Sequence, residues 1–290
     1  MQIAITTWRN WLQLSAARTT IDAYTYELNR IATFYHDADL RTLTFDDLTA
    51  YLASRIEDGI GQSAIYRATN ALRSFYKFHL GNLSPAARLP MRKPALKQQR
   101  CLSLTQLNDL MTNIDTSAPI GRRDLAIVSF MVDTGFRAAE VCRIEVDQVD
   151  LKNRIAWTII KGGQSGFGAF SEATSVYCAT WKADRAAMSH CSAFFLGFEG
   201  HRVGEQLTTT GLRCLFRKLG KQAGLAAFSP HDLRRTFATL TTEAGAPSRV
   251  VQVGGRWSGL ELVVRYTQAL QVKAIMPYLP TAALGEKLKP

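Results

Sequence analysis

Residues 228–246 read FSPHDLRRTFATLTTEAGA, and this stretch predicts one well-delimited helix. Ser229 is placed to be the N-cap, Pro230 suits the first helical position, and Asp232 completes a capping box. Gly245 is a typical stop signal after the last helical turn. We therefore expect a helix that begins at Pro230 and carries its polar residues in the first two turns.

The first turns of this helix hold a histidine and two arginines. His231 and Arg234 are three positions apart and share one helix face, whereas Arg235 points about 100° away. The positive end of the helix dipole disfavours a charged imidazole. A neutral His231 could therefore accept a proton near neutral pH.

A second polar segment precedes this helix, at residues 132–144, VDTGFRAAEVCRI. Gly135 ends one predicted helix, and Arg137 stands at the start of the next. Glu140 lies three residues further on, on the same face as Arg137. Taken alone, such a pair is more often a surface ion pair than part of a functional site.

A third segment follows the helix, at residues 253–268, VGGRWSGLELVVRYTQ. It contains a glycine pair, then Trp257 between polar residues, then an apolar helical run that ends at Tyr266. Taken alone, Tyr266 would be assigned to the core or to the surface.

The overall charge points to a polyanionic partner. The 290 residues carry a formal net charge of +11. Each phosphate that a basic protein neutralises releases condensed counterions, so such an excess favours nucleic acid. A basic protein without such a partner remains the alternative.

The cysteines and the start of the chain bear on the cellular compartment. Five cysteines are scattered without a CxxC pair, so we expect free thiols. His190, Cys191, His201 and Cys214 match no zinc spacing, so no metal is expected. The start of the chain lacks a signal-peptide pattern, and no apolar run is long enough to span a membrane. We expect a cytoplasmic protein without membrane contact.

The N-terminal part, residues 1–85, predicts a bundle of four helices from its apolar stripes. Thr19 and Thr20, and Thr44 before Asp47, are predicted N-caps. The remainder, residues 101–290, predicts helices and two short strands, at 154–160 and 167–170. The expected fold is mostly α with a small antiparallel β-sheet in the C-terminal domain.

Residues 86–100 separate these two parts and contain no acidic residue. Pro90 and Pro94 discourage a continuous helix. The segment is predicted to be an interdomain linker that follows a DNA backbone, and a solvated basic loop is the alternative. Its basic residues are Arg88, Arg92, Lys93, Lys97 and Arg100.

In order and spacing, the three polar segments resemble the tyrosine recombinase (phage integrase) family, in its simple two-domain type. The family's TG-x-R-x-x-E pattern is matched by residues 134–140, and its H-x-L-R pattern by residues 231–234. Trp257 stands nine residues before Tyr266, at the family's spacing between a His or Trp and the nucleophile. Lys161 matches the lysine that the family carries in a β-turn.

The resemblance implies a helical core-binding (SAM-like) domain, an α+β catalytic domain and a site-specific recombinase that needs no metal or nucleotide cofactor. It implies that Tyr266 forms a 3′-phosphotyrosine and that Lys161 protonates the departing 5′-oxygen, with His231 assisting proton transfer at the tyrosine. Two guanidiniums would stabilise the charge on the phosphate oxygens, to which Trp257 would donate its N–H. The implied catalytic set is Arg137, Lys161, His231, Arg234, Trp257 and Tyr266, with Glu140 as structural support.

Two features depart from the family pattern. Gly255-Arg256-Trp257 stands where the family often has Leu-Gly-His, so Arg256 is expected to contact DNA or to be a surface charge. A glycine-rich stretch follows Lys161, where the family often places another basic residue. Arg235 is expected to be structural or, like Arg256, a tentative DNA contact.

The resemblance also implies an assembly on double-stranded DNA with specific recombination sites. The tail after Tyr266 carries apolar residues, which a monomer could fold onto itself. The resemblance implies instead that they pack on a neighbouring subunit in a homo-tetramer on paired sites, with a monomer or dimer off DNA. Two alternatives stay open: DNA relaxation or hairpin-end resolution by the same chemistry, and DNA binding without catalysis. The implied exchange residues of the tail are Val272, Ile275, Met276, Leu279 and Leu284.

Overall fold

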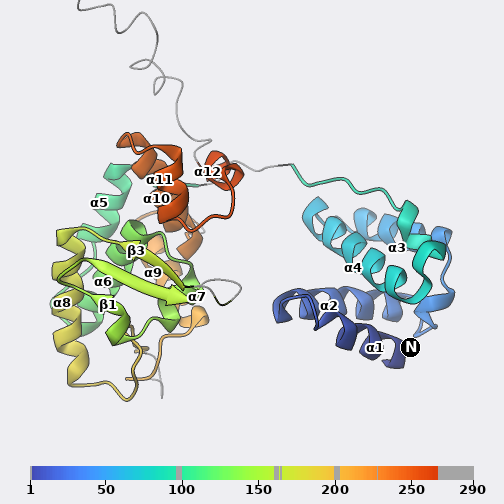
Figure 1. Ribbon diagram of the computed structural model, residues 1–290, viewed down its shortest axis with the longest axis horizontal. Helices are drawn as coiled ribbons and strands as arrows, with labels where there is room; N and C mark the ends of the chain where they lie inside the picture. Colours follow the sequence, from blue (N-terminus) through green and yellow to red (C-terminus); the bar gives the residue numbers. More distant parts are fainter. Residues whose placement is uncertain are drawn as a thin grey trace, which may run out of the picture. The chain divides into compact units, whose positions relative to one another are not determined.

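The chain divides into two units in the computed structural model, Met1–Lys97 and Gln98–Pro290 (Figure 1). The structure describes residues 2–95, 100–159, 163, 165–198, 203–226 and 228–266, without the side chains of residues 2, 265 and 266. None of the described helices has the length and apolarity that a membrane span requires.

The four helices expected in the N-terminal part are present. They are α1 (Gln2–Leu12), α2 (Arg18–Phe34), α3 (Phe45–Glu57) and α4 (Gln62–Leu80). Their apolar stripes meet in a core that includes the fully buried Trp8, Leu28 and Phe75. Three short 3-10 helices complete the unit, η1 (Leu40–Thr42), η2 (Gly81–Leu83) and η3 (Pro85–Arg88).

A side-chain cap was predicted for two of these helices and is present in one. The side chain of Thr44 accepts from the backbone N–H of Asp47 in a capping box, which confirms the predicted start of α3. The prediction for Thr19 and Thr20 is wrong, because α2 already begins at Arg18 with Ala17 as its N-cap.

The first residues of the basic segment pack into the N-terminal unit. Ala86 and Leu89 are buried in its core. Arg73 of α4 donates to the carbonyl oxygens of Ala87 and Leu89, at 2.9 and 2.6 Å. Packing and these hydrogen bonds therefore hold the chain against α4 at least as far as Leu89.

The second unit confirms the expected class, mostly α with a small antiparallel sheet. Its helices are α5 (Leu104–Thr112), α6 (Pro119–Thr134), α7 (Ala138–Arg143), η4 (Val146–Gln148), α8 (Glu172–Ala186), α9 (Thr209–Gln222), α10 (Pro230–Glu243), α11 (Ser248–Gly254) and α12 (Leu260–Tyr266). Its strands are β1 (Val149–Asp150), β2 (Ile155–Ile159) and β3 (Ser165–Ala169), paired antiparallel in the order β1-β2-β3.

Helix α6 lies at the centre of this unit and is buried along most of its length. It packs against α8 and against α10, and Phe130 on α6 contacts the ring of Phe136 just beyond the helix end. Helices α10, α11 and α12 pack against one another at one end of the unit (Figure 1). This arrangement brings the end of α6 next to the start of α10, where two of the polar segments lie.

Candidate active site

Helix α10 begins as the sequence predicts. Ser229 is the N-cap, Pro230 is the first helical residue, and both the backbone N–H and the hydroxyl of Ser229 donate to Asp232 at 2.8 Å. The helix ends at Glu243, and Gly245 follows with a φ of 91°. The capping box therefore fixes the first turn, in which His231 lies.

Arg234 connects three polar segments of the chain. Its side chain is buried, with 1% of the residue exposed. Its Nη1 donates to the carbonyl oxygen of Gly135 and its Nη2 to that of Gly255. Its Cζ also lies 4.8 Å from the centroid of the Trp257 ring. One guanidinium thus holds α10 to the loop before Arg137 and to the loop before Trp257.

Arg137 is the N-cap residue of α7, and its side chain is 43% exposed. Its Nη1 donates to Oε1 of Glu140 at 2.8 Å, and its backbone N–H donates to Oε2 at 2.8 Å. The Glu140 side chain is only 4% exposed, so this is a buried carboxylate and not a surface ion pair. Burial opposes the charge of Glu140, but the hydrogen bonds from Arg137 and the charges of Arg256 and Arg137 lower its pKa overall.

Arg256 is the second cation on Glu140. Its Nη2 lies 3.3 Å from Oε2 of Glu140, and its side chain is 4% exposed. Burial lowers the pKa of Arg256 to about 10. The expectation that Arg256 is a surface charge is wrong, because its guanidinium is enclosed by the protein.

His231 is exposed at the start of α10. Partial desolvation by the surrounding protein, together with the positive charges of Arg235 and Arg234, lowers the pKa of its imidazole to about 4. The imidazole is therefore neutral at neutral pH and able to accept a proton. The charge of Arg137 lowers the pKa of this imidazole as well. His231 therefore lies in the electrostatic field of the two arginines proposed to bind phosphate, Arg137 and Arg234.

Trp257 is buried in a small cluster with Phe237, Val251 and Val263. Its ring centroid lies 6.2 Å from that of Phe237. The cluster therefore anchors α11 and α12 on α10, next to Arg234.

Two glycines have roles that the motifs alone do not reveal. Gly135 has a φ of 59°, and a Cβ there would lie 2.7 Å from the Phe237 ring. A Cβ on Gly255 would lie 2.1 Å from the Trp257 ring. Both carbonyls bind Arg234, so close backbone approach is what these positions require. In the sequence, a glycine beside each motif indicates a turn. It does not indicate that the glycine carbonyl binds Arg234.

Several predicted residues lie wholly or partly outside the described residues. These are Lys97, Lys161, the side chain of Tyr266 and the apolar tail residues that follow it. The backbone of Tyr266 is described and forms the last residue of α12. In the sequence, Lys161 falls between β2, which ends at Ile159, and β3, which begins at Ser165.

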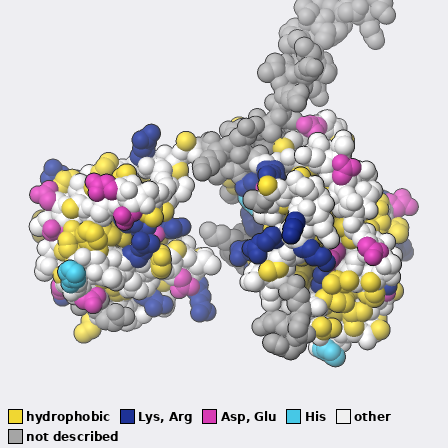
Figure 2. All heavy atoms as spheres, turned by 180° about the vertical axis from the view of Figure 1, so that it is seen from behind, with side chains coloured by type: hydrophobic (Ala, Val, Ile, Leu, Met, Phe, Trp, Pro, Cys, Tyr) yellow, Lys and Arg dark blue, Asp and Glu magenta, His cyan; other side chains and the backbone are white. Residues whose placement is uncertain are grey.

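The predicted DNA contacts have different surroundings. Arg92 and Lys93 are exposed, and Arg88 is exposed with its Cζ 4.9 Å from the centroid of the Phe45 ring. Arg100 is exposed and donates to the carbonyl oxygen of Ala226. Lys and Arg side chains gather on one face of the second unit (Figure 2).

Arg235 is held within the protein by an ion pair. Its Nη1 lies 2.9 Å from Oδ1 of Asp232, and its side chain is 18% exposed. This partner favours the structural alternative for Arg235 over a contact with DNA.

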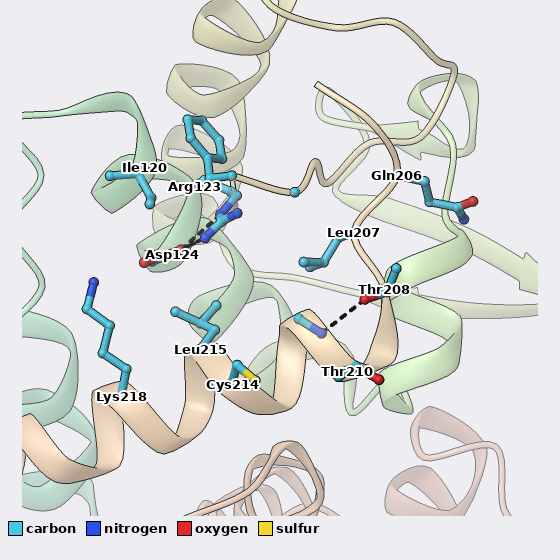
Figure 3. A pocket seen from close by; sticks show the side chains of 13 residues that line it. Ile120, Arg123, Asp124, Gln206, Leu207, Thr208, Thr210, Cys214, Leu215 and Lys218 are labelled. Atoms are coloured by element: carbon cyan, nitrogen blue, oxygen red, sulfur yellow. Dashed lines mark hydrogen bonds and ion pairs between the residues drawn. The ribbon is translucent and has the colours of Figure 1, made fainter. Parts of the chain in front are cut away.

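A pocket of about 600 Å³ lies elsewhere in the second unit, between the start of α6 and α9 (Figure 3). Arg123 and Asp124 form an ion pair of 2.5 Å at its wall, and Thr208 caps α9 by accepting from the N–H of Gly211 at 3.0 Å. Of the predicted catalytic residues that the structure describes with their side chains, none lines this pocket. Among the residues described, no group of three or more His, Cys, Asp or Glu side chains is arranged to hold a metal ion.

In the second unit, two arginines, a histidine and a tryptophan from three separate polar segments come together around the start of α10. The Phage integrase family matches residues 100–272, and the Phage integrase, N-terminal SAM-like domain matches residues 5–81. The chain belongs to the phage integrase family of tyrosine recombinases. The family and the relatives below support site-specific DNA recombination by the tyrosine mechanism as its activity.

The similar proteins are recombinases. Tyrosine recombinase XerC of Mycobacterium sp. (strain KMS) is 28% identical over 270 residues, which cover 87% of this chain and 89% of the relative. XerC of Bacillus pumilus (strain SAFR-032) is 30% identical over 245 residues, which cover 80% of each chain.

Solved structures share the fold at low sequence identity. XerH recombinase in a post-cleavage complex with a palindromic difH substrate has a TM-score of 0.73 at 18% identity, over 92% of this chain and 80% of that chain. A lambda integrase dimer bound to a core site has a TM-score of 0.72 at 14% identity, over 92% of this chain and 95% of that one.

Proposed function

We propose that this recombinase cleaves DNA with Tyr266 as the nucleophile, in a site assembled from Arg137, Lys161, His231, Arg234 and Trp257. The single observation that carries the proposal is the position of Arg234. Its guanidinium donates to the carbonyls of Gly135 and Gly255, which lie two residues before Arg137 and two residues before Trp257. Residues far apart in the sequence thus meet around one buried cation.

The proposed reaction is a transesterification. The phenolic oxygen of Tyr266 attacks phosphorus, its proton passes towards His231, and the bond from phosphorus to the 5′-oxygen breaks. Lys161 protonates that oxygen, and a 3′-phosphotyrosine remains. The 5′-hydroxyl of a partner strand then attacks the phosphotyrosine and restores the phosphodiester. Its proton passes to Lys161, and His231 returns a proton to the leaving oxygen of Tyr266.

Two guanidiniums would stabilise the extra negative charge on the non-bridging oxygens. Arg137 is more accessible than Arg234, because its side chain is 43% exposed. Its ion pair with Glu140 holds the guanidinium in place. Arg234 is covered in this structure, so it would exchange a carbonyl partner for a phosphate oxygen when DNA binds. Preorganised charge of this kind is usually the largest catalytic contribution, several kcal/mol.

Double-stranded DNA with specific recombination sites is the proposed partner. The exposed Arg88, Arg92, Lys93 and Arg100 would contact its backbone, together with Lys97. Arg256 is not proposed as a DNA contact, because its guanidinium is enclosed. The proposed domain arrangement is a core-binding domain over residues 1–85, a basic linker over residues 86–100 and a catalytic domain over residues 101–290.

On paired sites we expect a homo-tetramer in which the tail after Tyr266 packs on a neighbour, and a monomer or dimer off DNA. We also expect a cytoplasmic enzyme, with which the free thiols are consistent. The resemblance to the family implies that it needs no metal or nucleotide.

The test begins with the target, because the sequence does not define it. Recombined junctions mapped in a library of plasmid substrates would supply a site. On a nicked duplex of that site, the wild-type protein should form a covalent adduct that survives denaturation. Tyr266→Phe should form none, and Tyr26→Phe, which changes an exposed tyrosine of α2, should react like the wild type. An adduct that persists in Tyr266→Phe would overturn the assignment.

A further inference from the structure

Arg256 occupies a backbone conformation that disfavours it. Its φ is 54°, in the left-handed region that glycine adopts freely and other residues adopt at a cost. Its side chain is also buried, and its Nε finds no hydrogen-bond partner among the described residues. Both features destabilise the folded protein relative to one with glycine at this position. An arginine here therefore requires a role for its guanidinium that glycine cannot fill.

The guanidinium reaches three separate stretches of backbone. Its Nη1 donates to the carbonyl oxygens of Thr134, Phe167 and Gly254, at 3.1, 3.0 and 2.8 Å. The planar group also lies over the Phe136 ring, with Cζ 4.2 Å from its centroid. A planar cation with several fixed donors is suited to join segments that no regular hydrogen-bond ladder connects.

Each partner lies in a segment that carries a proposed catalytic residue or follows one in the sequence. Thr134 and Phe136 precede Arg137, and Glu140, which Nη2 contacts at 3.3 Å, is the carboxylate that holds the Arg137 side chain. Phe167 belongs to β3, the strand that follows Lys161 in the sequence. Gly254 ends α11, three residues before Trp257.

We infer that Arg256 is a positioning residue for DNA cleavage, which holds the Arg137 loop, strand β3 and the Trp257 loop in one arrangement through a single buried guanidinium. It touches no reacting atom and acts through Glu140 and the backbone of these segments. The inference rests on the proposed function, because it assigns the purpose of the arrangement to the cleavage step.

A merely structural role predicts a different result from a positioning role when Arg256 becomes glycine. Arg256→Gly removes the strained φ and the buried charge, so stability can stay the same or rise while the tether is lost. Arg154 provides a matched control, because it also has a positive φ, of 58°, and is exposed in the same unit. Arg154→Gly relieves the same kind of backbone strain without touching the network.

The measurement is the first-order rate of adduct formation at saturating protein on the nicked duplex, beside the apparent affinity for that duplex and the urea unfolding curve. We expect Arg256→Gly to cleave about 10- to 100-fold more slowly, because small misplacements of catalytic groups have effects of this size. Its affinity should stay within about twofold, since the buried guanidinium does not face DNA. Arg154→Gly should match the wild type in both.

The variant Arg256→Lys distinguishes the effect of the positive charge from that of the planar guanidinium. It also provides a second test if Arg256→Gly does not fold. A lysine retains the ion pair with Glu140 but cannot span the carbonyls in a plane. It should therefore cleave faster than Arg256→Gly yet more slowly than the wild type. A wild-type cleavage rate in either folded variant, or a loss that follows DNA affinity alone, would overturn the inference. Absence of an adduct with the wild-type protein would instead overturn the proposed function.

Discussion

In each unit of the molecule, a buried carboxylate lies between two arginines. In the N-terminal unit, Glu27 on α2 pairs with Arg55 on α3 at 2.5 Å and with Arg67 on α4 at 3.1 Å. In the second unit, Glu140 pairs with Arg137 at 2.8 Å and with Arg256 at 3.3 Å. In both clusters one arginine is enclosed and the other is about half exposed.

The two clusters differ in what they join. Glu27 connects three helices that also share an apolar core, so its cluster satisfies charges within a scaffold. Glu140 and its arginines connect a helix start, a strand and two loops. Similar electrostatics therefore serve stability in one unit and, in our proposal, the placement of catalytic groups in the other.

The largest contrast should come from the two half-exposed arginines. Arg137 and Arg67 have side chains 43% and 49% exposed, each with one buried carboxylate partner. Arg137→Ala should slow adduct formation about 10²- to 10³-fold, since it removes a preorganised charge from the phosphate. Arg67→Ala should leave that rate unchanged, and both should lower the free energy of unfolding by about 1 kcal/mol or less. Equal cleavage rates in the two variants would contradict the proposal that only the Glu140 cluster serves catalysis.

The buried carboxylates provide the second contrast. Glu27→Ala and Glu140→Ala each leave a buried guanidinium without its counter-charge, which should cost about 3–5 kcal/mol in the free energy of unfolding. Urea denaturation followed by circular dichroism measures this loss. Below the unfolding transition, Glu27→Ala should cleave like the wild type, whereas Glu140→Ala should cleave more slowly because Arg137 loses its support. Slower cleavage by folded Glu27→Ala would mean that the first cluster also serves catalysis.

The smallest expected effect concerns the pKa of His231, which partial desolvation and the charge of Arg235 lower from 6.5 to about 4. The unfolded chain binds this proton at a higher pH than the folded chain does, so stability falls as the pH drops from about 6.5 to about 4, and the loss remains below that range. In the folded chain the imidazole stays neutral above about pH 4. Arg235→Ala should raise this pKa towards its ordinary value and shift the acid limb of cleavage in the same direction. Titration of the imidazole by NMR measures the change, and an unchanged pKa would contradict the role of Arg235.

Local signals in the sequence were sufficient for the four N-terminal helices and for the starts of α3 and α10, but not for the short strand β1. The capping box at Ser229 and the apolar stripes depend on residues a few positions apart, and the structure confirms both. The polar segments were recognisable because their order and spacing match the family.

The tertiary partners of the arginines could not be predicted in this way. Arg256 looked like a surface charge because nothing near it in the sequence explains a buried cation, and its partners Thr134, Glu140 and Phe167 lie 89–122 residues away. For Arg234, the pattern indicated a phosphate ligand but not the two glycine carbonyls that hold it. Long-range contacts of this kind become visible only when the chain is folded.

The central claim is that Tyr266 carries the DNA during the reaction. The direct measurement is to trap the adduct on the nicked duplex, digest it with nuclease and protease, and locate the modified peptide by mass spectrometry. The account predicts a nucleotide joined through its 3′-phosphate to Tyr266, in the peptide that follows Arg265. A nucleotide on another residue, or a 5′-phosphate linkage, would contradict it.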